Sequence, residues 1–434
     1  MTSTALRTDR YELTMIDAAL RAGTHETPSV FELFARRLPD GRRFGVVAGT
    51  GRLLEAIAEF RFGPDELAWL KREQVVSPAA LDWLEAYRFT GTIRGYREGE
   101  LYFPGSPLLV VEAGFADGVV LETLALSVLN YDSAVASAAA RMVATAGGRP
   151  LAEMGSRRTG EHSAVAAARA AYIAGFGASS NLEAGRRWGV PTMGTAAHAF
   201  TLLFPTEEEA FAAQVASLGP GTTLLVDTYD IRKGVANAVH AAGTGLGAVR
   251  IDSGDLGVVV REVRAQLDEL GATGTRITVT NDLDEQAIAA LSSAPVDSYG
   301  VGTSLVTGSG APASGMVYKL VARQDAAGAW VPVGKTSEGK ATVGGRKQPV
   351  RALSGGVAVA EHVHVDDPPI ASLQPSAGRT LHVPLITDGS IHGDHLGPEG
   401  VSRARQHHAA AIAELPADAL RLSRGEPAIP TRYL

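Results

Sequence analysis

One histidine stands in a stretch of small residues that would leave room for chemistry at its ring. Residues 191–200 contain Pro191 and Gly194, so the helix predicted before them cannot continue. Small side chains at positions 194–197 then clear space beside His198, where the pattern predicts a junction of strand and loop. The pattern fits a reactive imidazole. It also fits a core histidine that is satisfied by a backbone carbonyl, so other residues must decide.

Two acidic motifs follow predicted strands further along the chain. Asp227 and Asp230 end one strand, and the run Asp252-Ser253-Gly254-Asp255 ends another. A pair of carboxylates on such a turn can hold ribose hydroxyls, or a magnesium ion through water. Aspartate and serine at these positions are also common helix caps. Both functions stay open at this point.

A glycine-rich motif and a pair of arginines supply complementary chemistry. Gly300, Gly302 and Thr303 offer bare backbone N–H groups and a hydroxyl to a phosphate, although a helix-packing loop has the same composition. The motif lacks the third glycine of a dinucleotide-binding fingerprint. Arg157 and Arg158 follow a predicted strand. A guanidinium that points into a pocket binds a carboxylate or phosphate through two N–H donors, whereas most surface arginines are solvated.

Alternating strands and helices must position these residues. The predicted strands, with the polar residues at their ends, cover 151–154, 190–193, 223–230, 248–255, 276–282 and 296–303. Such alternation predicts parallel strands with right-handed crossovers, whose carboxyl ends gather polar side chains at one face. The repeated short strands favour an irregular α/β barrel, and an open doubly wound sheet is the alternative.

The rest of the chain predicts a second α/β region. We expect an N-terminal domain over residues 1–118, a barrel domain over 119–310 and a C-terminal segment over 311–434. The C-terminal segment carries a basic loop that we expect to be a solvated face, with phosphate binding as the alternative; its cations are Lys335, Lys340, Arg346 and Lys347. His407 and His408 are adjacent on a predicted helix, so they do not form a chelating pair.

Composition excludes several classes of protein and site. The 434 residues carry 40 basic and 47 acidic side chains, a net charge of −7, whereas nucleic-acid binders are usually basic. The absence of cysteine excludes disulfides, thiolate metal sites and thiol nucleophiles. The N-terminus has no signal-peptide pattern and no run approaches the length of a membrane span. We therefore expect a cytoplasmic protein that does not bind nucleic acid or membrane.

A series of short motifs occurs together and in a fixed order. They are Thr8-Asp9 with Tyr11 and Leu13-Thr14-Met15, Phe31-Glu32, Gly155-Ser156-Arg157-Arg158, Ser179-Ser180-Asn181, Gly194-Thr195 with His198, Asp227-Thr228-Tyr229-Asp230, Arg250-Ile251-Asp252-Ser253-Gly254 and Gly300-Val301-Gly302-Thr303. As a set they resemble the nicotinate phosphoribosyltransferase family. The resemblance implies an irregular TIM-like α/β barrel plus a smaller α/β domain that the N-terminal and C-terminal segments build together. It also implies a homodimer with shared active sites.

The resemblance implies roles for individual residues. His198 matches the histidine that ATP phosphorylates to phosphohistidine, and Asp227 matches an acid near it. Arg157 matches the arginine that faces the pyridine ring and its carboxylate, and Tyr11 matches the aromatic ring that stacks there from the partner subunit. The other implied substrate contacts are Asn181, Thr195, Arg250, Asp252, Ser253, Gly254, Gly300, Gly302 and Thr303. Mg²⁺ would accompany ATP and phosphoribosyl pyrophosphate.

The implied reaction is ATP-dependent transfer of a phosphoribosyl group to nicotinate in NAD biosynthesis. The nearest alternative is the nicotinamide-using relative, but the position that would carry its acceptor aspartate is Asn181, which favours the acid. A barrel aldolase or epimerase would use a strand-end lysine, and the only lysine between residues 151 and 303, Lys233, lies beyond a strand. A non-catalytic ligand-binding module is the third possibility.

Overall fold

The protein divides into two compact units. The computed structural model describes residues 3–335, 342–365 and 378–434. Residues 1–137 together with 311–434 form one unit, and residues 138–310 form the other. The first boundary between the units, between residues 137 and 138, falls within helix α6 (Glu122–Thr145). The sequence predicted a boundary at residue 118, before this helix. The two units are called the discontinuous unit and the sheet unit below.

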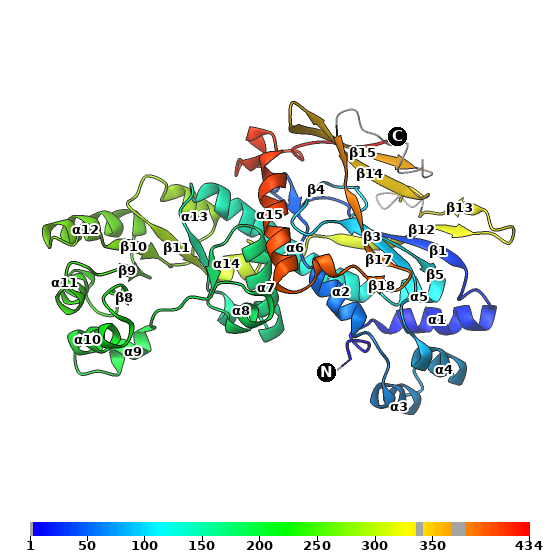
Figure 1. The fold of residues 1–434 in the computed structure, drawn as a ribbon, viewed down its shortest axis with the longest axis horizontal. Coiled ribbons are helices and arrows are strands. Elements are labelled where there is room, and N and C mark those ends of the chain that lie inside the picture. The colour runs from blue at the N-terminus through cyan, green and yellow to red at the C-terminus, as the bar shows by residue number, and fades with distance from the viewer. Residues whose placement is uncertain (1–2, 336–341, 366–377) are drawn as a thin grey trace. The chain divides into compact units, whose positions relative to one another are not determined.

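The discontinuous unit is built around a seven-stranded antiparallel sheet (Figure 1). Its strand order is β13-β12-β1-β5-β3-β17-β18. The first segment of the chain supplies β1 (Pro28–Ala35), β3 (Thr92–Tyr96) and β5 (Leu109–Gly114), and the last segment supplies β12 (Met316–Gln324), β13 (Trp330–Pro332), β17 (His382–Thr387) and β18 (Ser390–Ile391). Strands from both ends of the sequence therefore pair directly, as β1 does with β12, which confirms the prediction of an α/β region built from both segments.

Smaller sheets and helices complete this unit. A four-stranded sheet has the order β16 (Gly378–Thr380), β14 (Lys347–Ser354), β15 (Val357–Val365), β19 (Thr431–Tyr433), and β2 (Gly45–Val46) pairs with β4 (Leu101–Tyr102). The helices include α1 (Arg10–Ala22), α2 (Thr50–Ala58), α3 (Pro64–Arg72), α4 (Pro78–Ala86), α5 (Phe115–Val119) and α15 (Gly397–Ala413). The rings of Phe31 and Tyr318 stack at 5.2 Å in the core, which joins the two segments through apolar packing.

The sheet unit contains six parallel strands in the order β7-β6-β11-β10-β9-β8. The strands are β6 (Leu151–Glu153), β7 (Ala178–Ser179), β8 (Thr223–Leu225), β9 (Ala248–Ile251), β10 (Arg276–Val279) and β11 (Ser298–Val301). The sheet curls into a half-barrel, which confirms the prediction of an irregular barrel-like α/β fold. The strand predicted at 190–193 is reduced to one bridge, between Ser179 and Thr192.

Helices connect these strands and fix where each loop begins. They are α7 (Glu161–Ile173), α8 (Leu182–Trp188), α9 (His198–Leu202), α10 (Glu207–Leu218), α11 (Ile231–Ala242), α12 (Leu256–Glu269), α13 (Glu285–Ala290) and α14 (Thr303–Val306). Side-chain oxygens cap several of them: Asp230 accepts from the N–H of Lys233, and Asp255 accepts from the N–H of Gly257. The second acid of each acidic motif is thus a helix cap.

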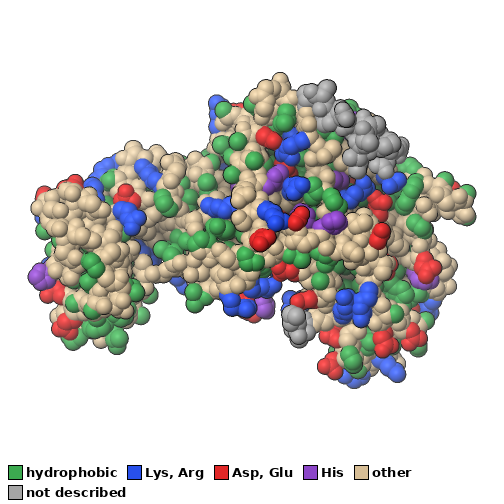
Figure 2. Space-filling model, viewed as in Figure 1, with side chains coloured by type: hydrophobic (Ala, Val, Ile, Leu, Met, Phe, Trp, Pro, Cys, Tyr) green, Lys and Arg blue, Asp and Glu red, His purple; other side chains and the backbone are tan. Residues whose placement is uncertain are grey.

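One helical segment, Phe115–Thr145, is long and apolar enough to span a membrane on length and composition, so the expectation that no run reaches that length is wrong among the described residues. Of its most apolar window, 67% is buried inside the protein, as in a core helix. Its buried alanines, such as Ala136 and Ala139, allow close packing of neighbouring backbone. On the face drawn in Figure 2, acidic and basic side chains are interspersed.

Candidate functional site

A cavity of about 220 Å³ opens at the carboxyl ends of the parallel strands in the sheet unit. Its lining residues are Met154, Arg157, Arg158, Arg250, Asp252, Thr280, Asn281, Asp282, Gly300, Gly302 and Thr303. They lie near the carboxyl ends of β6, β9, β10 and β11 or directly after them. These strands are adjacent in the sheet, so parallel pairing brings together residues that are far apart in sequence. Three arginines and two aspartates give this small space both cationic and anionic walls, which suits a phosphorylated sugar.

The glycine motif is required by close packing at this face. A Cβ on Gly300 would lie 2.6 Å from Cγ2 of Thr280 and 2.7 Å from Sδ of Met154, so a side chain does not fit there. A Cβ on Gly302 would lie 3.3 Å from the carbonyl oxygen of Met154. Helix α14 then begins at Thr303, whose hydroxyl-bearing side chain lines the cavity. The loop therefore brings bare backbone to the cavity wall, as a phosphate-binding loop must.

Thr280 organises the charged side chains of the cavity. Its hydroxyl oxygen accepts from Nε of Arg250 at 2.9 Å and donates to Oδ1 of Asp252 at 2.6 Å. Arg250 also reaches the carbonyl oxygen of Ala196, in the loop before His198, at 3.4 Å. The sequence did not single out Thr280. The same rule, a polar residue at the carboxyl end of a parallel strand, would have found it.

His198 is the first residue of α9 and keeps its ring accessible. Its side chain is 40% exposed, Nδ1 is 3.1 Å from Oγ1 of Thr228, and Nε2 is 3.8 Å from Oδ1 of Asp227 and 4.0 Å from Oδ2 of Asp252. The alternative of a core histidine held by a backbone carbonyl is therefore wrong. The ring faces a hydroxyl on one side and two carboxylates on the other.

Asp227 is held by one oxygen and leaves the other unused. Its side chain is buried, and Oδ2 accepts from the N–H of Asp252 and from Oγ of Ser253, both at 2.7 Å. Oδ1, which faces the His198 ring, has no hydrogen-bond partner among the described residues. A buried carboxylate oxygen without a donor is costly, so this atom is suited to receive a proton-bearing or cationic group. Gly254, at φ +82°, makes the adjacent turn possible.

Five predicted substrate contacts are not among the residues that line the cavity: Ser253 and Gly254, which belong to the turn beside Asp227, and Asn181, Thr195 and Tyr11. Asn181 caps α8 by accepting from the N–H of Ala184 at 3.0 Å, and its Nδ2 donates to Oγ of Ser156 at 3.0 Å. Thr195 has its hydroxyl 3.5 Å from the carbonyl of Ala196. Tyr11 belongs to α1 of the discontinuous unit, is 45% exposed, and has its pKa raised to about 12 by partial burial and nearby acids, with Glu122 first among them. A substrate contact for these residues stays a prediction.

The basic loop of the C-terminal segment is partly internal. Lys347 is buried and donates from Nζ to Oε2 of Glu32 at 2.7 Å, so the expectation of a solvated face is wrong for this residue. Arg346 lies over the ring of Trp330 at 5.2 Å. Lys340 lies outside the described residues. The tertiary packing of β14 has withdrawn Lys347 from solvent, which local charge patterning could not predict.

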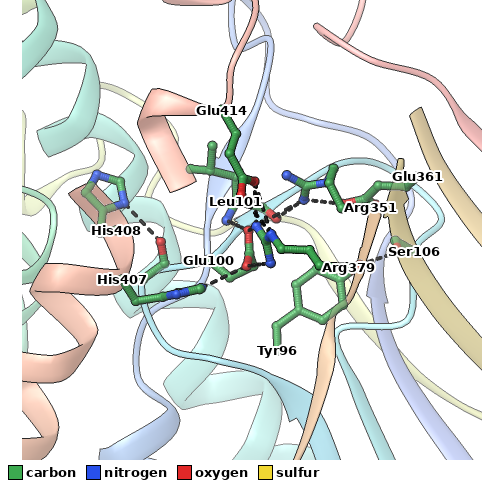
Figure 3. Close-up of polar contacts among 11 residues, drawn as sticks. Tyr96, Glu100, Leu101, Ser106, Arg351, Glu361, Arg379, His407, His408 and Glu414 are labelled. Atoms are coloured by element: carbon green, nitrogen blue, oxygen red, sulfur yellow. Dashed lines mark hydrogen bonds and ion pairs between the residues drawn. The ribbon is translucent and has the colours of Figure 1, made fainter. Parts of the chain in front are cut away.

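The C-terminal histidines belong to a polar network. Figure 3 shows His407 and Arg379 pointing toward Glu100, and His408 beside them. Nε2 of His407 lies 2.8 Å from Oε2 of Glu100, and Nδ1 of His408 lies 3.0 Å from the carbonyl oxygen of Gly99. Burial lowers the pKa of His408 to about 4. Within the described residues, no group of three or more histidine, aspartate or glutamate side chains could hold a metal ion.

Comparison with known proteins gives a consistent picture. Residues 6–130 match the model of the nicotinate phosphoribosyltransferase N-terminal domain. The Mycobacterium tuberculosis nicotinate phosphoribosyltransferase pncB1 is 59% identical over 438 residues, which cover 99% of this chain and 95% of that protein. The Bacillus subtilis nicotinate phosphoribosyltransferase is 38% identical over 363 residues, covering 81% of this chain and 74% of that protein.

The solved structures agree with the sequences. The crystal structure of human nicotinic acid phosphoribosyltransferase matches with a TM-score of 0.82 and 26% identity, over 98% of this chain and 97% of that one. The nicotinate-nucleotide pyrophosphorylase from Pyrococcus furiosus matches with a TM-score of 0.77 at 22% identity, which reflects the shared fold. With relatives that extend over nearly its full length, the chain belongs to the nicotinate phosphoribosyltransferase family.

Proposed function

We propose that the protein catalyses the transfer of a phosphoribosyl group from phosphoribosyl pyrophosphate to nicotinate, with ATP hydrolysis coupled to the transfer. The products are nicotinate mononucleotide, pyrophosphate, ADP and phosphate, and the reaction belongs to NAD biosynthesis. The observation that carries the proposal is the cavity at the strand ends, where Arg250, Asp252 and the bare loop at Gly300 and Gly302 lie together. Family membership supports the substrate class.

We propose that ATP phosphorylates His198. Nδ1 would attack the γ-phosphorus while the bond to the ADP oxygen breaks, and Nε2–H would face the unused Oδ1 of Asp227. The 3.8 Å separation of those two atoms supports this arrangement, because the imidazolium that forms on phosphorylation gains a carboxylate partner. Thr228, whose hydroxyl is 3.1 Å from Nδ1, would turn aside or contact the phosphoryl group. Water later takes the phosphoryl group as phosphate.

In the transfer step the pyridine nitrogen bonds to the anomeric carbon and pyrophosphate leaves. Positive charge develops on the sugar, so placement and charge contribute more than acid–base chemistry. Asp252 would hold the ribose hydroxyls, and Arg157 or Arg158 would bind the nicotinate carboxylate through two donors. Mg²⁺ fits as a companion of the substrate phosphates, because Mg²⁺ is usually held by one or two carboxylates plus phosphates, and Asp252 and Asp282 line the cavity. Bound there, it would neutralise phosphate charge.

The other functions are less well supported. An aldolase would use a lysine in the site, and none stands among the described residues that line the cavity. A nicotinamide-using enzyme would need an acceptor for the carboxamide, whereas the wall beside the glycine loop carries Arg157 and Arg158. A binding module would not consume ATP. We place the enzyme in the cytoplasm on the same family grounds.

The deciding experiment measures nicotinate mononucleotide formed from nicotinate and phosphoribosyl pyrophosphate, with and without ATP. We expect ATP to stimulate the wild-type protein and to leave an acid-labile phosphoryl label on it. In His198→Ala the label and the stimulation should both disappear, while some ATP-independent transfer remains. No product under either condition would reject the transferase. A label that survives the substitution would move the phosphoryl acceptor to another residue.

We also propose a homodimer in which Tyr11 reaches the partner's site. If so, mixing Tyr11→Ala with His198→Ala subunits should restore activity, because each mixed dimer then has one site with both residues intact. The exposed ring of Tyr11 supports its availability to a partner. Each variant alone serves as the control. Failure to recover after subunit exchange, verified by mass spectrometry of tagged chains, would return Tyr11 to its own subunit.

A further inference from the structure

One fully buried carboxylate beside the cavity has no part in the proposed reaction. Glu153 is the last residue of β6, and its side chain is 0% exposed. The next residue, Met154, lines the cavity. Burial raises the pKa of Glu153, as expected for an acid with no cationic partner close to it. A buried acid is retained at a cost, so its contacts indicate what it does.

Both carboxylate oxygens of Glu153 hold loops that leave the strand ends. Oε1 accepts from the backbone N–H of Gly155, and Oε2 accepts from Oγ of Ser179 at 2.5 Å. The carbonyl oxygen of Gly155 in turn accepts from the N–H of Arg158 at 2.8 Å. The single side chain of Glu153 therefore connects the end of β7 to the short helical turn Ser156–Arg158, which carries both cavity arginines.

A second contact ties the same two loops together near the surface. Nδ2 of Asn181 donates to Oγ of Ser156 at 3.0 Å, and the backbone N–H of Asn181 donates to Oγ of Ser179 at 2.9 Å. Glu153 and Asn181 therefore hold the turn through separate hydrogen bonds, one to Gly155 and one to Ser156. A Cβ on Gly155 would collide with Val306 of α14, so the turn has no room to relax toward that helix.

We propose that Glu153 is a positioning residue that aims the Arg157–Arg158 turn at the carboxylate of the pyridine substrate, and so sets the preference for nicotinate over nicotinamide. The inference rests on the proposed function. The two groups that donate to Glu153 are a backbone N–H and a hydroxyl, and neither is charged. Glu153 therefore acts through the direction of its hydrogen bonds. A misplacement of about 1 Å in a substrate-binding group can cost about 100-fold in rate, which makes such a brace consequential.

The test compares kcat/KM for nicotinate and for nicotinamide in three variants. Glu153→Met keeps the side-chain length and removes both acceptors, so nicotinate kcat/KM should fall roughly 10- to 100-fold, mainly through KM, with a much smaller loss for nicotinamide. Glu153→Gln can still accept from Gly155 and donate to Ser179, so it should restore most of the preference. Ser179→Ala removes one contact only and should fall between them, which keeps the test open if Glu153→Met fails to fold.

Controls separate this inference from the function on which it rests. Asp297→Asn changes a carboxylate that accepts from the N–H of Ile277 at 2.7 Å, at the amino ends of the strands, and should leave the preference unchanged. Equal losses for both substrates in Glu153→Met and Ser179→Ala would make Glu153 a purely structural residue and overturn the proposal. Unchanged preference in both Arg157→Ala and Arg158→Ala would also overturn it, while transferase activity itself would stand. A wild-type protein without transferase activity would instead reject the proposed function.

Discussion

Each unit of the protein contains a cluster of acids, arginines and a histidine, and the two clusters are built differently. In the discontinuous unit, Glu100 is 1% exposed and its two oxygens accept from the guanidinium of Arg379 at 2.6 and 2.9 Å and from His407 at 2.8 Å (Figure 3). In the sheet unit, His198 is 40% exposed and its nearest carboxylates lie 3.8 and 4.0 Å away.

The difference separates charges that hold the fold from charges that are available to ligands. Burial alone would raise the pKa of Glu100, but hydrogen bonds from His407 and Arg379 and the nearby guanidinium of Arg351 hold it well below its usual range. Every acceptor position of that carboxylate is in use. Asp227 is equally buried, yet it keeps one oxygen without a partner among the described residues, directed at the histidine. A buried carboxylate oxygen without a donor lowers the stability of the resting protein. It is stabilised only when a positive charge forms beside it.

The largest effect is expected from a substitution in the cluster around Glu100, which stabilises the discontinuous unit. Glu100→Gln removes the charge that pairs with Arg379, and loss of one partner from a buried pair costs about 3–5 kcal/mol in the free energy of unfolding. Urea unfolding of both proteins measures it, and nicotinate KM of the folded variant should not change. Arg403→Ala is the control, because its pair with Asp394 is exposed and is worth less than about 1 kcal/mol. Equal effects of the two substitutions would contradict the role of burial.

The pH dependence gives the same prediction a second measurement. Because the folded-state pKa of Glu100 lies below its unfolded value, its contribution is present above the unfolded value and is lost as the pH falls below about 4.3. The stability difference between wild type and Glu100→Gln should therefore shrink in acid. A constant difference down to low pH would show that the charge of Glu100 does not contribute.

The next largest effect concerns the cavity of the sheet unit, where we expect a loss of activity without a loss of stability. Arg157→Ala should lower kcat/KM for nicotinate by about 100-fold, or about 2.7 kcal/mol. The substrate carboxylate would then enter the site without the two guanidinium N–H donors that Arg157 offers it. Nicotinamide should lose much less, and the unfolding midpoint should stay the same. Arg158→Ala is the comparison. If the two arginines exchange these effects, Arg158 is the carboxylate partner.

The smallest effect concerns the hydrogen bonds that hold the charged side chains of the cavity in place. Thr280→Val keeps the shape of the side chain and removes the hydroxyl that joins Arg250 to Asp252, so kcat/KM for phosphoribosyl pyrophosphate should fall about 10-fold, or about 1.4 kcal/mol. Thr280→Ser should recover most of it. Thr278→Val is the matched control on the same strand, where the hydroxyl pairs with Ser298. Equal losses in the two valine variants would mean that the strand, not the cavity, is affected.

Much of the sheet unit followed from the sequence alone. Strand periodicity, turn residues and helix caps are local properties, so the alternation of strands and helices and the position of the polar strand ends could be predicted. Because parallel strands share one carboxyl edge, Arg157, Arg250, Asp252 and the Gly300 loop were expected together, and all line the cavity. The family resemblance supplied the substrate class and the roles, which no spacing determines.

Only the tertiary structure decided how each polar residue is used. Asp227 and Asp230 lie on the same motif, yet one faces His198 and the other caps α11, because β8 ends at Leu225 and Asp230 directly precedes the helix. Lys347 appeared in a basic run and is buried against Glu32, since β14 and β1 meet only in the folded chain. The hydrogen-bond partner of such a side chain is often far away in the sequence, whereas sequence patterns describe only residues a few positions apart. The sequence therefore determined which atoms were available, and the packing of distant strands determined which remained unpaired.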